Sequence, residues 1–242
     1  MPGAVPAILD CLQGFGLHWD GEVHYQSRHL GDYSNAIARL QLQQQVYTCS
    51  CSRKRLNGYP GIYPGFCRNK KLREAEGSLR VKAGDVEICF DDRTQGRHRE
   101  NIAMQHGDFI IRRKDGIIAY QLAVVIDDHL QRVNQVVRGF DLLDSTAKQI
   151  YLHSLLGYPP PAYMHVPVIV DNQGNKLSKQ TCAQAVDCRQ PAATLFLLLS
   201  LLKQNPPAEL RNAAIHDILE WAISHWQPEQ LKKIRAIEQT ID

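Results

Sequence analysis

Three near-continuous apolar runs in the middle of the chain limit its fold more than any other feature of the sequence. They cover residues 119–128 (AYQLAVVIDD), 133–137 (VNQVV) and 166–170 (VPVIV), and charges and turn residues bound each run. Strands that are buried on both faces of a parallel sheet carry such continuous runs, whereas half-exposed strands alternate apolar with polar residues. Residues 145–156 have a helical pattern that ends at Gly157, a common helix stop. Strand, helix and strand at this spacing predict a crossover unit, and therefore an α/β fold with a parallel sheet.

Shorter elements surround this central unit. Residues 2–12 and 32–45 carry apolar residues at helical spacing. Between residues 78 and 111, short alternating runs predict a small antiparallel insertion of strands. The patterns beyond residue 179 are helical, and the expected helices cover residues 194–202, 207–223 and 228–237.

Composition excludes several classes of protein. The 242 residues are 44% hydrophobic and 22% charged, and Gly 16 with Pro 12 is ordinary usage, so collagen-like and low-complexity chains are excluded. The 28 basic and 25 acidic residues leave a net charge of +3, which neither requires nor forbids a nucleic-acid partner. The longest apolar stretch, residues 193–202, is about half as long as a membrane span. Because the first residues also lack a secretory signal pattern, we expect a cytoplasmic protein without a membrane partner.

The cysteines point to a metal site rather than to disulfides. Seven is an odd number, and without an export signal it argues against a disulfide framework. Cys49, Cys51 and Cys67 lie within nineteen residues of a Gly- and Pro-rich loop segment, whereas the other four are scattered and expected as separate thiols. Three thiolates favour zinc in tetrahedral geometry. Tyr63 is the nearest oxygen donor in a compatible position. The alternative is three reduced thiols that share a loop without a metal.

A pair of lysines is a candidate for nucleotide binding. Lys176 and Lys179 flank a serine in a loop that follows the third apolar run. Two lysines placed in this way can hold triphosphate oxygens as point charges. The alternative is a solvated basic loop.

Polar residues at the ends of the first two apolar runs are candidates for ligand binding as well. Asp127 and Asp128 end the first run, and Arg138 follows the second. The carboxyl ends of parallel strands are where α/β sheets bind ligands, and an arginine there can clamp a carboxylate with two parallel hydrogen bonds. The alternative is that the two aspartates cap a turn and pair with Arg112 or Arg113.

Several stretches, in the same order along the chain, resemble the catalytic core of class I glutamyl-tRNA synthetases. The sequence KLSKQ at 176–180 is similar to that family's second signature loop, KMSKS, and residues 120–157 and 165–180 match its pattern nearly throughout. The cysteine cluster with its tyrosine matches the family's zinc-bearing insertion. The resemblance implies a Rossmann-like parallel sheet, a small zinc-bearing insertion and a helical C-terminal region. It also implies roles for single residues: glutamate binding for Tyr120 and Arg138, catalysis for Lys176 and Lys179, ATP binding for Lys179, and zinc binding for Cys49, Cys51, Tyr63 and Cys67.

The length of the chain narrows the resemblance to one branch of that family. The segment after the lysine loop, residues 181–242, is too short for a large helical anticodon-binding region. This is similar to the family's short paralogues, which attach glutamate to queuosine at the wobble position of tRNA(Asp). The implied partners are L-glutamate, ATP as substrate and queuosine-containing tRNA(Asp), and we expect a monomer. Two alternatives stay open: a fragment of an ordinary glutamyl-tRNA synthetase, and a non-catalytic zinc-bearing RNA-binding remnant.

The resemblance also implies a division of the chain. We expect the remainder of an N-terminal Rossmann half at 1–45, an acceptor-stem-like zinc insertion at 46–111, a second Rossmann half at 112–180 and a helical region at 181–242. The family's first strand and its HIGH-like signature precede the residue that matches Pro2. We therefore expect residues 1–242 alone to show little activation of glutamate.

Overall fold

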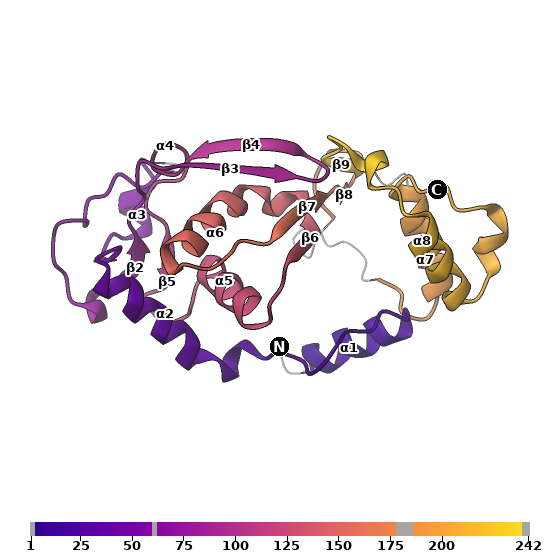
Figure 1. The fold of residues 1–242 in the computed structure, drawn as a ribbon, viewed down its shortest axis with the longest axis horizontal. Coiled ribbons are helices and arrows are strands. Elements are labelled where there is room, and N and C mark those ends of the chain that lie inside the picture. The colour runs from indigo at the N-terminus through magenta and orange to yellow at the C-terminus, as the bar shows by residue number, and fades with distance from the viewer. Residues whose placement is uncertain (1–2, 60–61, 178–185, 239–242) are drawn as a thin grey trace. The chain divides into compact units, whose positions relative to one another are not determined.

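The computed structural model describes residues 3–59, 62–177 and 186–238 (Figure 1). It contains two compact units, and each is described by itself. The larger unit comprises His24–Asp92 and Gly96–Met164, and the smaller comprises Met1–Val23, Arg93–Gln95 and His165–Asp242. Within the described ranges, no helix is both long and apolar enough to cross a membrane.

The antiparallel strands expected between residues 78 and 111 are present, and two of them belong to a three-stranded sheet in the larger unit. The strand order is β1 (Val46–Cys49), β2 (Ser78–Val81) and β5 (Ile110–Arg112), and both pairs are antiparallel. Cys49 at the end of β1 lies opposite Ser78 at the start of β2. Glycine is required at position 77 because a Cβ there would lie 2.1 Å from the Cys49 carbonyl oxygen.

The second sheet is mixed, so the expected parallel sheet is correct only in part. Its order is β4 (Gly96–Asn101), β3 (Glu87–Asp92), β7 (Ala162–Val166) and β6 (Gln135–Gly139). β3 and β4 form an antiparallel hairpin, seen as a long ribbon in Figure 1, while β3 pairs in parallel with β7. The apolar run at 133–137 is therefore represented by β6, displaced by two residues.

The apolar run at 119–128 forms a helix, and the prediction of a strand there is wrong. α5 (Tyr120–Leu130) buries Leu122, Ala123, Val125 and Ile126, a spacing that places these side chains on one helical face. A continuous apolar run suits a buried helix as well as a buried strand, so periodicity alone does not separate the two. This face packs against α2 (Leu30–Leu42) and α6 (Leu143–Leu156), which leaves little polar surface to mark the helix in the sequence.

The helix predicted at 145–156 is confirmed as α6, and it starts two residues earlier. Gly157 ends it in the left-handed conformation with φ 67°, and the backbone N–H of Tyr158 donates to the carbonyl of His153 at 2.9 Å. α6 connects β6 to β7, so the predicted strand–helix–strand unit is present, with β7 as its second strand. The shorter helices of this unit are α3 (Arg53–Leu56), α4 (Ile102–Gln105), η1 (Gln26–Arg28), η2 (Glu74–Glu76) and η3 (Phe140–Leu142).

The smaller unit packs helices around a second core. α1 (Ala4–Gly14), α7 (Pro191–Leu201) and α8 (Ile215–His225) contribute to it or flank it, and its buried residues are Phe15, Leu195, Leu199 and Ile218. The helix predicted over 207–223 is divided into η5 (Ala208–Asn212) and α8 by two residues with extended backbone.

The last predicted helix, over 228–237, is wrong in its second half. Only η6 (Pro228–Leu231) is helical, and β9 (Ala236–Glu238) pairs in parallel with β8 (Val168–Val170). β8 lies within the third apolar run. The free edge of a strand that is distant in sequence therefore determines the conformation of residues 236–238, against their local pattern.

Two of the cysteines that were expected to be separate thiols form a disulfide. Cys11 in α1 is joined to Cys188, with Cα atoms 5.7 Å apart and 177 positions between them in the sequence. Such a separation leaves no local signal for pairing. The free cysteines in the described residues are Cys49, Cys51, Cys67 and Cys89.

Candidate functional site

A group of polar side chains surrounds Arg138 in the larger unit. Arg138 lies near the carboxyl end of β6, and Tyr120 is the first residue of α5. Nη1 of Arg138 donates to the Tyr120 hydroxyl oxygen at 3.3 Å, and Nη2 donates to Oγ1 of Thr146 at 2.9 Å. The guanidinium carbon lies 5.3 Å from the centre of the Tyr163 ring on β7. The structure therefore brings the two predicted glutamate-binding residues together.

Burial determines the electrostatics of this group. Arg138 is half-buried, Tyr120 is exposed and Thr146 is fully buried. Burial raises the pKa of Asp128 to about 6, although the positive charge of Arg138 acts to lower it. Hydroxyl groups orient the guanidinium fork, and a fork held in this way is suited to bind a planar carboxylate.

Asp127 has a structural role. Its carboxylate accepts hydrogen bonds from the Tyr33 hydroxyl at 2.6 Å and from Nε2 of Gln26 at 2.7 Å, and lies 3.1 Å from Nε2 of His24. These contacts tie α5 to α2 and to the segment before α2. Arg112 pairs with Glu74, and Arg113 pairs with Asp115. The contacts of Asp127 therefore match neither the expected ligand-binding role nor the expected pairing with these arginines.

The predicted nucleotide loop belongs to the smaller unit. Lys176 is exposed, and its backbone forms an isolated antiparallel bridge with Val170 of β8. Asp171 builds the turn before it, because its Oδ1 accepts from the backbone N–H of Asn175 at 2.8 Å. Lys179 lies outside the described residues. The ATP-binding and catalytic roles of the two lysines stay predictions.

The three clustered cysteines and Tyr63 converge on one buried point. Cys49 lies at the end of β1, and all three Sγ atoms lie within 4.8 Å of one another. The Tyr63 hydroxyl oxygen is 3.2 Å from Sγ of Cys49 and 3.4 Å from Sγ of Cys51. Cys49, Cys67 and Tyr63 are buried, and the backbone N–H of Cys67 donates to the Tyr63 hydroxyl at 3.1 Å.

The donors of this cluster fit a tetrahedral zinc ion. Zinc–sulfur bonds of about 2.3 Å place the sulfurs of a tetrahedral site about 3.8 Å apart, and the Sγ atoms of Cys51 and Cys67 are 3.6 Å apart. Burial raises the pKa of Cys51 and of Tyr63. Burial also acts to raise the pKa of Cys67, but hydrogen bonds from the Ser50 backbone and the Tyr63 hydroxyl lower it to about 7. A thiol with this pKa supplies the thiolate that a metal requires.

Sequence reasoning missed the residues that hold these groups in place. Thr146 on α6 and Tyr163 on β7 contact Arg138. Asp108 accepts a hydrogen bond from Arg68, the residue that follows Cys67. No local pattern marks them, because each meets its partner only where separate elements pack together.

Two solved structures share the fold. They are a glutamate tRNA ligase from Elizabethkingia meningosepticum in complex with its amino acid, with a TM-score of 0.76, and the glutamate-tRNA synthetase of Elizabethkingia anophelis, with a TM-score of 0.77. Each is 19% identical to this chain, and the match covers 99% of this chain and 58% of the solved chain. The chain thus spans less than two thirds of their length.

The family whose model matches is described as "tRNA synthetases class I (E and Q), catalytic domain", and the match covers residues 64–203. Together with the fold, this match defines the catalytic domain of a class I aminoacyl-tRNA synthetase, a ligase. The resemblance stated from the sequence is confirmed at this level.

More similar relatives narrow the class. A protein of Ectopseudomonas mendocina named Glutamyl-Q tRNA(Asp) synthetase is 45% identical over 237 residues, which cover 98% of this chain and 81% of that protein. A protein of the same name from Pseudomonas aeruginosa is 43% identical over 233 residues, which cover 96% and 80%. The chain belongs to the glutamyl-Q tRNA(Asp) synthetase family.

Proposed function

We propose that the protein activates glutamate with ATP and transfers the glutamyl group to queuosine at the wobble position of tRNA(Asp). Its family membership supports the reaction as a whole. The observation that carries the proposal in this chain is the pairing of Arg138 with Tyr120, because it places a carboxylate-binding fork beside a hydroxyl donor. The partners are therefore L-glutamate, ATP and queuosine-containing tRNA(Asp).

Arg138 and Tyr120 would hold the side-chain carboxylate of glutamate. A carboxylate that accepts two hydrogen bonds from a guanidinium is a weaker nucleophile, so the carboxylate that reacts has to be the other one. Thr146 supports this arrangement by fixing one nitrogen of the fork at 2.9 Å. The residues around Arg138 thus select glutamate and leave its α-carboxylate to react.

The chemistry then proceeds in two steps. An oxygen of the α-carboxylate attacks the α-phosphorus of ATP, the bond to the bridging oxygen breaks, and pyrophosphate leaves. Lys176 and Lys179 would stabilise the negative charge that develops on the pyrophosphate. In the second step a hydroxyl of queuosine attacks the acyl carbon of the adenylate, and AMP leaves with the bonding electron pair.

We also propose that Cys49, Cys51, Tyr63 and Cys67 bind one zinc ion. The spacing and burial of the donors support this assignment. The metal would stabilise the fold, since it would join β1 to the loop that carries Tyr63 and Cys67. The division into segments 1–45, 46–111, 112–180 and 181–242 and the cytoplasmic, monomeric state remain predictions.

The alternatives from the sequence are not favoured. A fragment of an ordinary glutamyl-tRNA synthetase is expected to match ordinary synthetases best, whereas the relatives at 45% and 43% identity carry the glutamyl-Q name. The same relatives argue against a non-catalytic remnant.

A transfer assay tests the proposal. The purified protein, extended at its N-terminus by the first strand and HIGH-like segment of a glutamyl-Q relative, is incubated with ATP, radiolabelled glutamate and tRNA from cells that make or cannot make queuosine. Residues 1–242 alone are assayed beside it and are expected to show little transfer. We expect label only on the queuosine-containing tRNA, and cleavage of the labelled RNA should locate it in the anticodon loop. Label on the 3′ end of tRNA(Glu) would support the ordinary synthetase instead, and the absence of both transfer and ATP–pyrophosphate exchange in the extended form would contradict the ligase.

Two variants control this assay. Arg138→Ala should lose transfer at low glutamate concentration. Cys89→Ser replaces an exposed free thiol on β3 and should leave transfer unchanged.

A further inference from the structure

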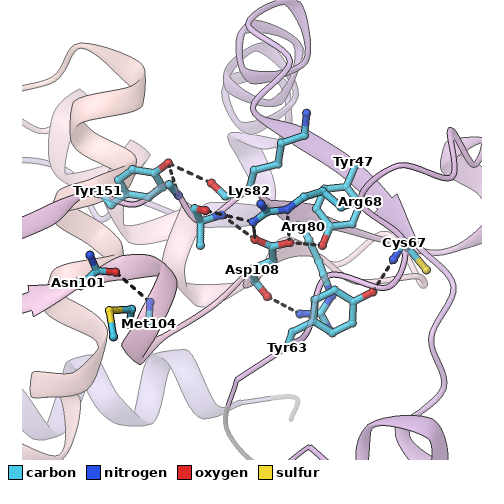
Figure 2. A network of polar contacts seen from close by, with 12 residues as sticks. Tyr47, Tyr63, Cys67, Arg68, Arg80, Lys82, Asn101, Met104, Asp108 and Tyr151 are labelled. Carbon is cyan, nitrogen blue, oxygen red and sulfur yellow. Dashed lines mark hydrogen bonds and ion pairs between the residues drawn. The ribbon is translucent and has the colours of Figure 1, made fainter.

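A buried carboxylate lies beside the cysteine cluster without belonging to it. Asp108 is 2% exposed, and Figure 2 shows its carboxylate between Arg68 and Tyr47. Oδ2 accepts from the Tyr47 hydroxyl at 2.5 Å and from Nε of Arg68 at 3.0 Å. Oδ1 accepts from the backbone N–H of Ala83 at 2.7 Å and pairs with Nη2 of Arg68. Burial acts to raise the pKa of Asp108, but these partners hold it below its usual range, so the group is ionised at neutral pH.

The backbone of Asp108 is linked through Arg80 to Tyr63, whose phenol belongs to the cysteine cluster. Its carbonyl oxygen accepts from Nη1 of Arg80 at 2.7 Å, and the Arg80 guanidinium carbon lies 4.0 Å from the centre of the Tyr63 ring. The neighbouring Gly107 forms a bridge with Tyr63, and a Cβ at position 107 would lie 3.1 Å from the Tyr63 nitrogen. Arg80 is buried, so this cation–π contact is shielded from water.

Each side chain that donates a hydrogen bond to Asp108 lies next to a candidate metal ligand in sequence or in space. Tyr47 lies on β1 two residues before Cys49, and Arg68 directly follows Cys67. The ring of Tyr63 lies against Arg80. One carboxylate therefore connects β1, which carries Cys49, to the loop that carries Tyr63 and Cys67.

The apolar side chains that pack against these segments, Tyr47, Leu56, Phe66 and Leu72, are only partly buried. The buried members of the apolar cluster in this region are Cys49, Tyr63 and Cys67, which are the candidate ligands themselves. Stability alone does not explain a buried charge at this position, because a well-packed apolar group is often as stabilising as a buried ion pair. The partners of the Asp108 charge lie beside the candidate ligands, which indicates that the charge serves to position them.

We propose that Asp108 is a positioning residue of the metal centre: through Tyr47, Arg68 and Arg80 it holds the segments of Cys49, Cys67 and Tyr63 in the geometry that binds the ion. This rests on the proposed zinc site. The two guanidinium groups that Asp108 orients also offset the negative charge that thiolates bring to a buried site.

The test compares two buried aspartates. Asp108→Asn keeps the shape of the side chain and removes its charge. Asp127→Asn is the matched control, because Asp127 is also buried and accepts side-chain hydrogen bonds, yet its partners come from α2 and the segment before it. Zinc affinity of the full chain is measured by competition with a chromophoric chelator, and thermal unfolding is recorded for each variant.

We expect Asp108→Asn to bind zinc about 10- to 100-fold more weakly, as the loss of a residue that orients metal ligands does elsewhere. Asp127→Asn should stay within about twofold of the parent in zinc affinity, even where both variants unfold at a lower temperature. In the cobalt-substituted protein, the absorption bands of the tetrahedral thiolate site should change for Asp108→Asn alone. A purely structural role of Asp108 predicts equal effects of the two substitutions on these bands.

The outcomes separate this proposal from the zinc site itself. A parent protein that binds no zinc overturns both. A parent that binds zinc with an Asp108→Asn variant of equal affinity overturns the positioning role and leaves the zinc site in place. Where Asp108→Asn does not fold, Arg68→Gln and Tyr47→Phe decide the question: each removes one contact of Asp108, each is expected to weaken zinc binding about tenfold, and unchanged affinity in both overturns the proposal.

Discussion

Replacement of Arg138 by alanine is expected to weaken the use of glutamate by about 30- to 150-fold. Removing one partner of a desolvated, hydrogen-bonded charge pair costs about 2–5 kcal/mol. Arg138 is only half-buried, so water screens part of the interaction and the lower range of about 2–3 kcal/mol applies. Each 1.4 kcal/mol is a factor of about ten in affinity, which gives the stated range.

Substitution of two neighbours of Arg138 is expected to have smaller effects on the KM for glutamate. Thr146→Val removes the 2.9 Å bond that orients Nη2 but keeps the shape of the side chain. Tyr120→Phe removes the hydroxyl that lies 3.3 Å from Nη1. A single hydrogen bond contributes about 0.5–1.5 kcal/mol, so each of these variants should raise the KM for glutamate about 2- to 12-fold.

The assay is glutamate-dependent ATP–pyrophosphate exchange by the N-terminally extended form, measured over a range of glutamate concentrations at saturating ATP. The KM for glutamate should rise in the order Tyr120→Phe or Thr146→Val, then Arg138→Ala, while the KM for ATP and the zinc content stay unchanged. A KM for glutamate within twofold of the parent in Arg138→Ala would refute the carboxylate-binding role of this arginine.

Three further predictions concern the metal, the pH and the backbone. Cys49→Ala with Cys67→Ala should remove about one zinc ion per chain, as measured by elemental analysis. Burial and the positive charge of His129 lower the pKa of His153 to about 4, so between pH 6.5 and 4 the unfolded chain binds a proton that the folded chain does not. The free energy of unfolding should therefore fall by up to about 3 kcal/mol as the pH is lowered through this window, and His153→Gln should remove that dependence in urea titrations. Gly77→Ala should destabilise the protein by at least about 1–3 kcal/mol, because the added Cβ meets the Cys49 carbonyl oxygen.

Each of these predictions has an outcome that contradicts it. Zinc content unchanged by the double cysteine substitution contradicts the metal ligands. A stability profile of His153→Gln that runs parallel to that of the parent from pH 7 to 4 contradicts the buried neutral imidazole. Gly77→Ala with an unfolding midpoint in urea equal to that of the parent contradicts the close approach of β1 and β2.

The candidate site was predictable to the extent that its residues are recognised by type and local order. The cysteine cluster was predictable because nineteen residues hold all four donors and three thiolates have few other chemical uses. Tyr120 and Arg138 were predicted on family resemblance and are in contact in the structure. From the residues alone, Arg138 was placed at the ends of two neighbouring strands. The second run does form a strand, but the first run forms the helix α5.

The residues that support the site were not predictable, and the reason is physical. Asp108 lies forty positions after Arg68 and sixty-one after Tyr47, and nothing in the residues near it indicates these contacts. Buried charges are stabilised by partners that come from separate elements, so their significance is visible only after those elements pack together.

The sequence by itself determined the family, the residues of the cysteine cluster and the helices and strands whose one-sided patterns report their burial. The tertiary structure decided whether residues 120–130 form a strand or a helix, because an element buried among α2 and α6 loses the polar stripe that would distinguish the two. It also decided that residues 236–238 join β8 as a strand and that Cys11 meets Cys188. Local patterns report which residues avoid water, whereas contacts between residues far apart in the chain depend on which surfaces fit together once it has folded.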